Sequence, residues 1–93
     1  MLAKSSDYLV YLLRCANGAL YTGVTTDIAR RLRAHNSGRG AKYLRQHGPG
    51  ELVYLENAGD HSAALKREAA IKRWPRKRKL ELLGQDSNLL RSS

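Results

Sequence analysis

Residues 9–35 read LVYLLRCANGALYTGVTTDIARRLRAH, a stretch that predicts a β-hairpin leading directly into a helix. Residues 9–13 form an apolar, β-prone first arm, and residues 19–24 form a second arm of similar composition. Asn17-Gly18 lies between the arms and is the strongest short signal for a hairpin turn. The sequence therefore predicts two adjacent antiparallel strands near the start of the chain.

The length of the hairpin loop decides where the two tyrosines of the arms point. A two-residue loop would place Tyr11 and Tyr21 on opposite faces of the hairpin. A three-residue loop over residues 16–18 shifts the pairing by one residue, so that Leu13 faces Tyr21 and both tyrosines share a face. We expect the second register, because the function argued below requires both tyrosines on one face.

The helix that follows the hairpin carries polar residues on the stripe expected to face the core. Either Thr26 or Asp27 can cap its first turn. Positions at helical spacing share one stripe: Ile28, Arg31, Leu32 and His35. A buried guanidinium needs a partner or a ligand, so Arg31 stands out as a candidate functional residue. Alternatively, Arg31 lies at the edge of the stripe and extends its charged end into solvent.

The second half of the chain predicts one further strand and two helices. Residues 51–56 have an apolar interior with charged ends, as expected for a third strand. Asp60 is a good cap for a helix over residues 61–73, which ends because Trp74 precedes a proline. A last short helix is expected over residues 76–83. The pattern of strands and helices thus predicts a small mixed α/β domain.

Glu68 lies on the inward stripe of the helix predicted over residues 61–73. Leu65, Glu68 and Ile71 follow one another at steps of three residues, so the carboxylate lies between apolar neighbours. A carboxylate at such a position is costly unless a cation, a metal ion or a proton offsets its charge. Alternatively, Glu68 pairs with Lys72 one turn later at the surface. The pattern leaves both interpretations open.

The stretch from Lys66 to Lys79 is strongly basic, with eight Lys or Arg among its fourteen residues and Glu68 as the sole acid. Such a run can be a solvated helix face, but a face kept in solution by ion pairs would hold more acids. Cationic side chains that meet phosphates release counterions and add affinity for nucleic acid of any sequence. The candidate phosphate contacts are Arg39, Lys42, Lys72, Arg73, Arg76, Lys77 and Lys79. Trp74 is expected to pack in the core rather than to stack on bases.

Composition indicates a single, strongly basic domain. The 93 residues include 17 Lys and Arg against 8 acids, a formal net charge of +9 that favours polyanionic partners. Cys15 is the only cysteine, and its place in a strand predicts a packed, inert thiol in a reducing compartment. No apolar run approaches the roughly 20 residues of a membrane span, and no signal peptide is recognisable, so we expect a cytoplasmic protein. One domain is expected over residues 5–83, followed by a flexible tail over residues 84–93.

Several of these residues, taken in order, resemble the GIY-YIG endonuclease family, most closely its short, stand-alone bacterial branch. The residues that carry the resemblance are Val10-Tyr11-Leu12, Tyr21-Thr22-Gly23, Arg31, His35, Asn36-Ser37-Gly38, Ala41-Lys42-Tyr43, Leu52-Val53-Tyr54 and Glu68. Nine residues separate the two tyrosines. Within the two signature triplets, only the tyrosines and Gly23 match literally. The ordered set at compatible spacings, rather than any single piece, makes the resemblance specific.

The resemblance implies an α/β (α+β) fold in which helices flank a three-stranded antiparallel sheet. It implies phosphodiester hydrolysis by a single-metal endonuclease, with Mg²⁺ as the expected metal and DNA processing or repair as the expected role. By the same likeness, Tyr11 or Tyr21 contacts the attacking water or the phosphate, Arg31 binds the scissile phosphate and Glu68 holds the metal. His35, one helical turn after Arg31, can shuttle a proton or orient water near neutral pH.

A second interpretation is a nucleic-acid-binding module that keeps the fold and the basic run but does not cleave. Both interpretations predict salt-sensitive binding, with DNA as the expected partner. Only the first predicts Mg²⁺-dependent cleavage that disappears when Glu68 is replaced while binding persists.

Overall fold

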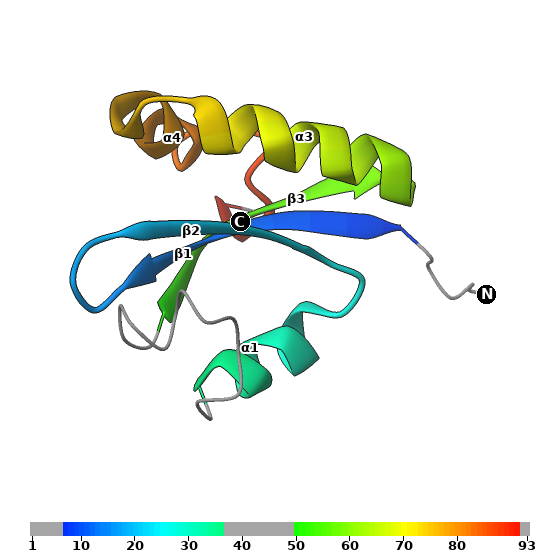
Figure 1. Cartoon of the computed structure of the whole chain (residues 1–93), viewed down its shortest axis with the longest axis horizontal. Coiled ribbons are helices and arrows are strands. Elements are labelled where there is room, and N and C mark those ends of the chain that lie inside the picture. The colour runs from blue at the N-terminus through cyan, green and yellow to red at the C-terminus, as the bar shows by residue number, and fades with distance from the viewer. Residues whose placement is uncertain (1–6, 37–49, 92–93) are drawn as a thin grey trace.

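The computed structural model describes residues 7–36 and 50–91, which form a three-stranded antiparallel sheet with helices on both faces (Figure 1). The strands are β1 (Tyr8–Cys15), β2 (Leu20–Thr25) and β3 (Gly50–Gly59). The helices are α1 (Ile28–Asn36), α3 (His61–Arg73), α4 (Arg76–Leu82) and the 3₁₀ helix η1 (Leu89–Arg91). None of these helices has the length and apolarity needed to cross a membrane. The strand order is β2-β1-β3, which confirms the predicted fold class and makes β2 an edge strand.

The hairpin between β1 and β2 has the predicted register. Leu13 pairs with Tyr21, and Tyr11 pairs with Gly23. Gly18 has a φ of 89°, the left-handed conformation that this loop requires, and its amide donates to the carbonyl of Cys15 at 2.8 Å. The rings of Tyr11 and Tyr21 lie on the same face of the sheet, 6.2 Å apart.

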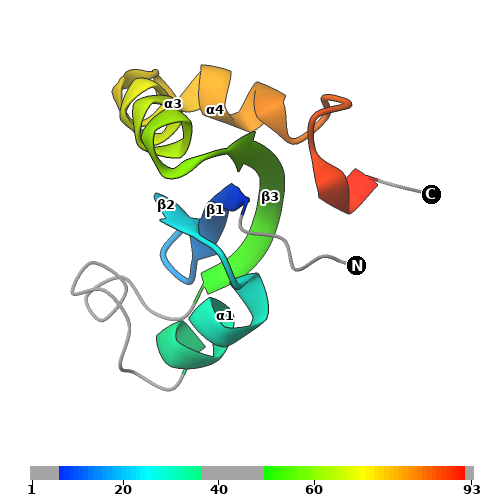
Figure 2. The ribbon, with the colours of Figure 1, turned by 90° about the vertical axis from the view of Figure 1, so that its right-hand side faces the viewer.

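Helices cover the two faces of the sheet separately, with α3 and α4 on one side and α1 on the other (Figure 2). The buried residues of the half-core under α3 and α4 are Val10, Leu12, Tyr54, Ala64, Ile71 and Leu82. Those of the half-core toward α1 are Tyr11, Leu13 and Cys15. Successive β1 residues alternate between the halves because the side-chain period of a strand is two. Cys15 is buried as predicted, and burial raises the pKa of its thiol, which disfavours the reactive thiolate.

The helix ends follow the predicted capping residues. Asp27, rather than Thr26, caps α1, because its carboxylate accepts a hydrogen bond from the Arg30 amide at 3.1 Å. Asp60 caps α3 as predicted. Helix α3 ends where Trp74 takes up an extended backbone ahead of the proline. Local sequence signals thus determine the start of α1 and both ends of α3.

The end of one strand and the exposure of one side chain differ from the predictions. Strand β3 continues three residues beyond the predicted Glu56, because its pairing with β1 resumes after an irregularity between Tyr8 and Leu9. Leu65, predicted to point inward, is 44% exposed. The stripe of α3 that packs on the sheet is therefore centred on Ala64 and Ile71, which are buried.

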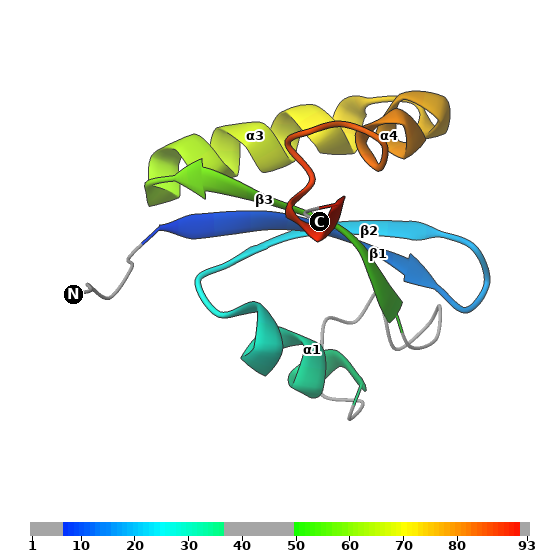
Figure 3. The ribbon, with the colours of Figure 1, turned by 180° about the vertical axis from the view of Figure 1, so that it is seen from behind.

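The segment after α4 also differs from the flexible tail that was predicted. Asn88 is 4% exposed, and its side-chain amide donates to the carbonyls of Val53 and Leu83. Its side-chain oxygen accepts a hydrogen bond from the amide of Leu55. The chain then returns to the sheet, where η1 contacts β3 (Figure 3). One buried asparagine thus holds residues 84–91 against the domain.

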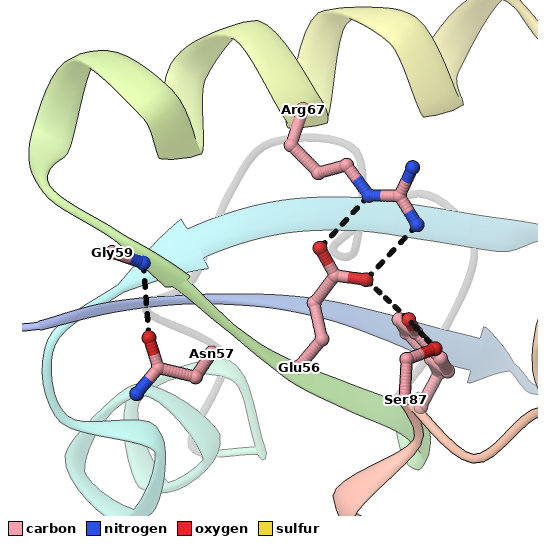
Figure 4. A network of polar contacts seen from close by, with 6 residues as sticks. Glu56, Asn57, Gly59, Arg67 and Ser87 are labelled. Carbon is pink, nitrogen blue, oxygen red and sulfur yellow. Dashed lines mark hydrogen bonds and ion pairs between the residues drawn. The ribbon is translucent and has the colours of Figure 1, made fainter.

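A polar network connects β3, α3 and the C-terminal segment (Figure 4). Glu56 is 8% exposed, and the Arg67 guanidinium donates two hydrogen bonds to its carboxylate, at 2.8 and 3.1 Å. The Tyr54 hydroxyl donates to the same carboxylate and lies 2.9 Å from the hydroxyl of Ser87. A buried carboxylate needs partners of this kind, so the network fixes α3 relative to the sheet.

The close approach of Tyr11 to Gly23 gives a testable prediction. A Cβ atom at residue 23 would lie 2.5 Å from both Cζ and Oη of Tyr11, whose ring is buried. Gly23→Ala is therefore expected to displace this ring and to lower the free energy of unfolding by about 1–3 kcal/mol. Denaturant unfolding measures the loss. Gly84→Ala is the control, since the nearest atom to its Cβ is 4.0 Å away, and equal stability of the two variants would contradict the prediction.

Candidate active site

A cleft of about 470 Å³ crosses the edge strand β2 and is lined from both faces of the sheet. Tyr11, Tyr21 and Arg31 line it from β1, β2 and α1, and Glu68 lines it from α3. Gly23 lies between these groups on β2, where its missing side chain leaves room for the Tyr11 ring. Four of the five predicted catalytic residues thus meet at one opening.

His35, the fifth predicted residue, lies behind the two tyrosines. Its side chain is buried, and its Nε2 is 3.1 Å from the Tyr11 hydroxyl. Its ring centroid lies 6.2 Å from that of Tyr11 and 5.7 Å from that of Tyr21, the latter in an edge-on arrangement. Its Nδ1 is buried and has no hydrogen-bond partner within residues 7–36 and 50–91. Tyr11 therefore connects the buried imidazole to the open cleft.

The environment keeps Tyr11 protonated and His35 neutral. Burial raises the pKa of Tyr11, and the nearby Tyr21 and Glu68 raise it further, while Arg31 acts in the opposite direction. Burial lowers the pKa of His35, and the positive charge of Arg31 lowers it further. At neutral pH the hydrogen bond therefore joins a phenol to a neutral imidazole, which can accept a proton.

Arg31 lies at the edge of the helix stripe rather than under it. The residue is exposed, and within the part of the chain that the structure describes no carboxylate forms an ion pair with it. It still acts electrostatically on both Tyr11 and His35. Of the two interpretations that the sequence left open, the structure agrees with the one that places Arg31 at the edge of the stripe with its charged end exposed. Arg31 lines the same cleft as Tyr11 and Tyr21.

Glu68 combines both of the interpretations that its sequence position left open. Its carboxylate forms an ion pair with Lys72 at 3.3 Å, in the i, i+4 geometry of a helix surface. Its side chain is only 20% exposed, and it lines the same cleft as the tyrosines. A partly buried carboxylate next to the cleft is available to a ligand that displaces the ammonium group.

The oxygen donors of the cleft fit a hard divalent cation that is bound together with substrate. Among the described residues no group of three or more His, Cys, Asp or Glu side chains is arranged as a metal site. Mg²⁺ keeps several water ligands and is commonly held by one or two carboxylates together with substrate phosphates. Glu68 supplies one carboxylate beside an opening that is accessible to water, so the donor set suits such a cation and not a preformed zinc cage.

The predicted phosphate contacts fall into two groups. Lys72 lies beside Glu68, whereas Arg73, Arg76, Lys77 and Lys79 continue from the end of α3 into α4, at the end of the sheet opposite the start of β1 (Figure 1). We use the name basic face for Lys72, Arg73, Arg76, Lys77 and Lys79 together. All are exposed except Lys79, which is half-buried. Arg39 and Lys42 lie outside the described residues.

Sequence reasoning missed several groups beside the cleft and the basic face. Tyr8 and His61 form a stacked ring pair that lines the cleft, and exposed Leu65 lines it one helical turn after His61. The helical spacing of His61, Leu65 and Glu68 at i, i+4 and i+7 could have revealed this set. Arg78, which was not predicted, lies 3.9 Å from the centroid of the Trp74 ring, and Trp74 itself packs on the core as predicted.

The fold and the cleft define a small mixed α/β domain with two tyrosines, an arginine and a glutamate around one opening. A family model described as the GIY-YIG catalytic domain matches residues 7–81. The chain therefore belongs to the GIY-YIG family, a family of nucleases that generally use a divalent metal ion and act on nucleic acid.

The chain is similar to short proteins that consist of little more than this domain. The UPF0213 protein HQ_3675A of Haloquadratum walsbyi is 45% identical over 85 residues, which cover 90% of this chain and 96% of that protein. A UPF0213 protein of Yersinia pestis (strain Pestoides F) is 49% identical over 87 residues, or 94% and 92% of the two chains. The predicted likeness to a short, stand-alone branch of the family is confirmed.

Solved structures agree with this assignment. The solution NMR structure of the UPF0213 protein BH0048 from Bacillus halodurans has a TM-score of 0.56 at 37% identity, covering 90% of this chain and 89% of that chain. The solution NMR structure of the protein EF2693 from E. faecalis has a TM-score of 0.61 at 39% identity and covers 88% of each chain.

The buried imidazole predicts a pH dependence of stability. The folded-state pKa of His35 lies below its ordinary value of 6.5, so the unfolded chain binds a proton first as the pH falls. The His35 contribution to the free energy of unfolding is therefore complete above about pH 6.5 and is lost as the pH falls toward the folded-state pKa. Denaturant unfolding between pH 8 and pH 5 measures the loss. His35→Gln should show a shallower decline below pH 6.5, and parallel profiles would contradict this.

Proposed function

We propose that the protein is a metal-dependent endonuclease that hydrolyses phosphodiester bonds of DNA, in cytoplasmic DNA processing or repair. The observation that carries this proposal is the shared cleft, in which Tyr11, Tyr21, Arg31 and Glu68 surround one opening. A site for hydrolysis needs a proton acceptor, a group that stabilises charge on the phosphoryl oxygens and a means of neutralising the leaving oxygen. The cleft and the residue behind it offer candidates for each part.

Tyr11 and His35 act together as the proton acceptor in this proposal. A phenol whose pKa is raised by burial does not ionise at neutral pH, so Tyr11 alone is a poor base. Its hydroxyl can accept a proton from the attacking water while it gives its own proton to Nε2 of neutral His35, 3.1 Å away. The relay leaves hydroxide on phosphorus, an intact phenol and an imidazolium. Tyr21 packs edge-on against the imidazole of His35 and so holds the imidazole in place. Tyr21 also lines the cleft.

Arg31 is proposed to bind the scissile phosphate. Its guanidinium carries a fixed charge and a fork of donors that suit phosphate oxygens. It is exposed at the cleft and has no ion-pair partner within residues 7–36 and 50–91, so its charge is free for a ligand. In this geometry the guanidinium can stabilise negative charge on the phosphoryl group without first breaking a contact of its own.

Glu68 is proposed to hold the divalent cation, with Mg²⁺ as the preferred ion. When bound, such a cation stabilises charge on the phosphoryl and leaving oxygens. The carboxylate is partly buried and lines the cleft, and its contact with Lys72 is a surface-type pair of small stability. The basic face then guides and holds the nucleic-acid backbone, and Arg78, stacked on Trp74, adds a further guanidinium beside it.

Cleavage assays on labelled DNA test the proposed roles. In Mg²⁺, Glu68→Gln is expected to abolish nicking, as EDTA does for the wild type, while binding persists. Arg31→Gln is expected to reduce cleavage by about a hundredfold or more, comparable to losing one preorganised charge-stabilising donor. Because Arg31 is exposed and unpaired among the described residues, this variant should unfold at the same temperature as the wild type.

Arg30→Gln is the matched control for the Arg31 variant. Arg30 is the preceding residue on α1, is also exposed, and does not line the cleft across β2. The Arg30→Gln variant should cleave at the wild-type rate. Binding without metal-dependent cleavage in the wild type would favour the non-catalytic binding module. A large loss of melting temperature in Arg31→Gln would make Arg31 a structural residue.

The basic face predicts a salt dependence of binding. Replacing Arg76, Lys77 and Lys79 together with Gln should reduce the slope of log K against log salt concentration by up to ~3, near one unit for each lost phosphate contact. Fluorescence anisotropy of a labelled duplex at several salt concentrations measures the slope. Arg33→Gln is the control, because Arg33 is exposed and lies on α1, on the opposite face of the sheet. An unchanged slope in the triple variant would make the basic face a solvated surface.

A further inference from the structure

We propose that the ring pair of Tyr8 and His61 is a binding platform for one unpaired nucleobase beside the scissile phosphate. This inference rests on the proposed nuclease function and adds a feature of its substrate. The two ring centroids lie 4.6 Å apart with an interplanar angle of 23°, so the rings are stacked. Both residues line the cleft that contains the candidate catalytic groups.

The platform is preordered and open on one side. Tyr8 is the first residue of the central strand, and its ring packs against the half-core under α3. His61 is the first residue of α3, directly after the capping residue Asp60, and it is exposed. Tyr8 thus supports the imidazole from the core side and leaves the rest of this ring accessible from the cleft. A rigid ring pair loses little conformational freedom when a base stacks on it.

Leu65 is an independent sign that this end of the cleft binds an apolar surface. It is 44% exposed and lines the cleft one turn after His61. A contact between Tyr8 and His61 that served only to hold α3 on the sheet would not require an exposed leucine next to it. A nucleobase stacked on the imidazole would cover the Leu65 side chain. The flat, weakly polar face of a base suits contact with both groups.

The spacing along α3 places the platform within reach of the phosphate site. His61, Leu65 and Glu68 follow one another at i, i+4 and i+7 on one side of the helix. Seven residues of α-helix correspond to an axial rise of about 10 Å. A cleft of about 470 Å³ is large for a single phosphate group and falls in the size range of small-molecule sites. The cleft therefore accommodates a nucleotide whose phosphate lies near Glu68 and whose base lies on His61.

A base in this position must be unpaired, because a base within a duplex is stacked and paired on its own strand. The expected substrate therefore has an unpaired nucleotide next to the cleaved bond, as in a gap, a flap or a single strand. Stacking on an aromatic ring tolerates every base, so the platform selects unpaired structure and not sequence.

A binding experiment in EDTA tests the platform separately from cleavage. One DNA probe carries 2-aminopurine in a single-stranded gap, and a second carries it in a continuous duplex; each also has an end label for anisotropy. The wild type is expected to bind both and to quench 2-aminopurine only in the gap. His61→Ala should lose the quenching and weaken binding of the gapped probe by about five- to a hundredfold, with little change for the duplex.

Two further variants separate stacking from stability. His61→Phe restores a ring and should restore quenching, whereas a residue needed only for its hydrogen bonds would not be rescued. Ser62→Ala, at the neighbouring exposed position, should behave as the wild type. Binding of the wild type without quenching, or equal weakening of both probes by His61→Ala, would overturn the platform alone. Failure of the wild type to bind either probe would overturn the proposed function and the platform with it.

Discussion

The close contact between Tyr11 and Gly23 is the constraint on which the rest of the site depends. In the β1–β2 ladder these residues are partners, and the tyrosine ring occupies the space that a side chain at residue 23 would fill. The Tyr11 hydroxyl therefore lies against the edge strand β2 and also contacts Nε2 of buried His35. Without a glycine on β2, the Tyr11 ring could not keep this position, in which it both lines the cleft and contacts His35. The absent Cβ at residue 23 thus determines where the Tyr11 hydroxyl lies.

The position of Glu68 depends in turn on how α3 is held against the sheet. Arg67, the preceding residue, forms a two-pronged hydrogen bond to the carboxylate of Glu56 on β3. That carboxylate is buried, and Tyr54 and Ser87 extend the same network to the C-terminal segment. Because Glu68 follows Arg67 on the same helix, an anchor at Arg67 restrains the orientation of Glu68 relative to the sheet. The packing of the C-terminal segment therefore supports the geometry of a cleft to which it contributes no residue.

Much of the fold could be predicted from local signals in the sequence. The Asn17-Gly18 turn, the cap at Asp60 and the proline after Trp74 act over a few residues, and each determines a boundary that the structure confirms. The hairpin register was chosen from function, because the loop sequence itself permits two lengths. The gathering of Tyr11, Tyr21, Arg31 and Glu68 in one cleft was foreseen from the family resemblance rather than from periodicity.

The features that were missed depend on contacts between distant parts of the chain. The helical stripe through Leu65 and Glu68 could not show that Leu65 stays exposed, because this depends on how α3 packs on the sheet, with Ala64 and Ile71 buried against it. A segment rich in polar residues gave no sign that the side chain of Asn88 bridges β3 and the end of α4. The hydrogen bonds between Asn88 and β3 join residues more than thirty positions apart, beyond the reach of any local pattern.

Two carboxylates lie close to α3, and their surroundings separate a structural role from a functional one. Both oxygens of Glu56 accept hydrogen bonds, from Arg67 and from Tyr54, and the group is almost fully buried, so its contacts are structural. Within residues 7–36 and 50–91, Glu68 forms one ion pair, with exposed Lys72 at the longer distance of 3.3 Å. An exposed pair of this kind contributes about 0–1 kcal/mol to stability. The surface pair predicted from the Glu-Lys spacing and the proposed metal site are therefore compatible, because a cation at this carboxylate would have to displace only a weak contact with an exposed ammonium group.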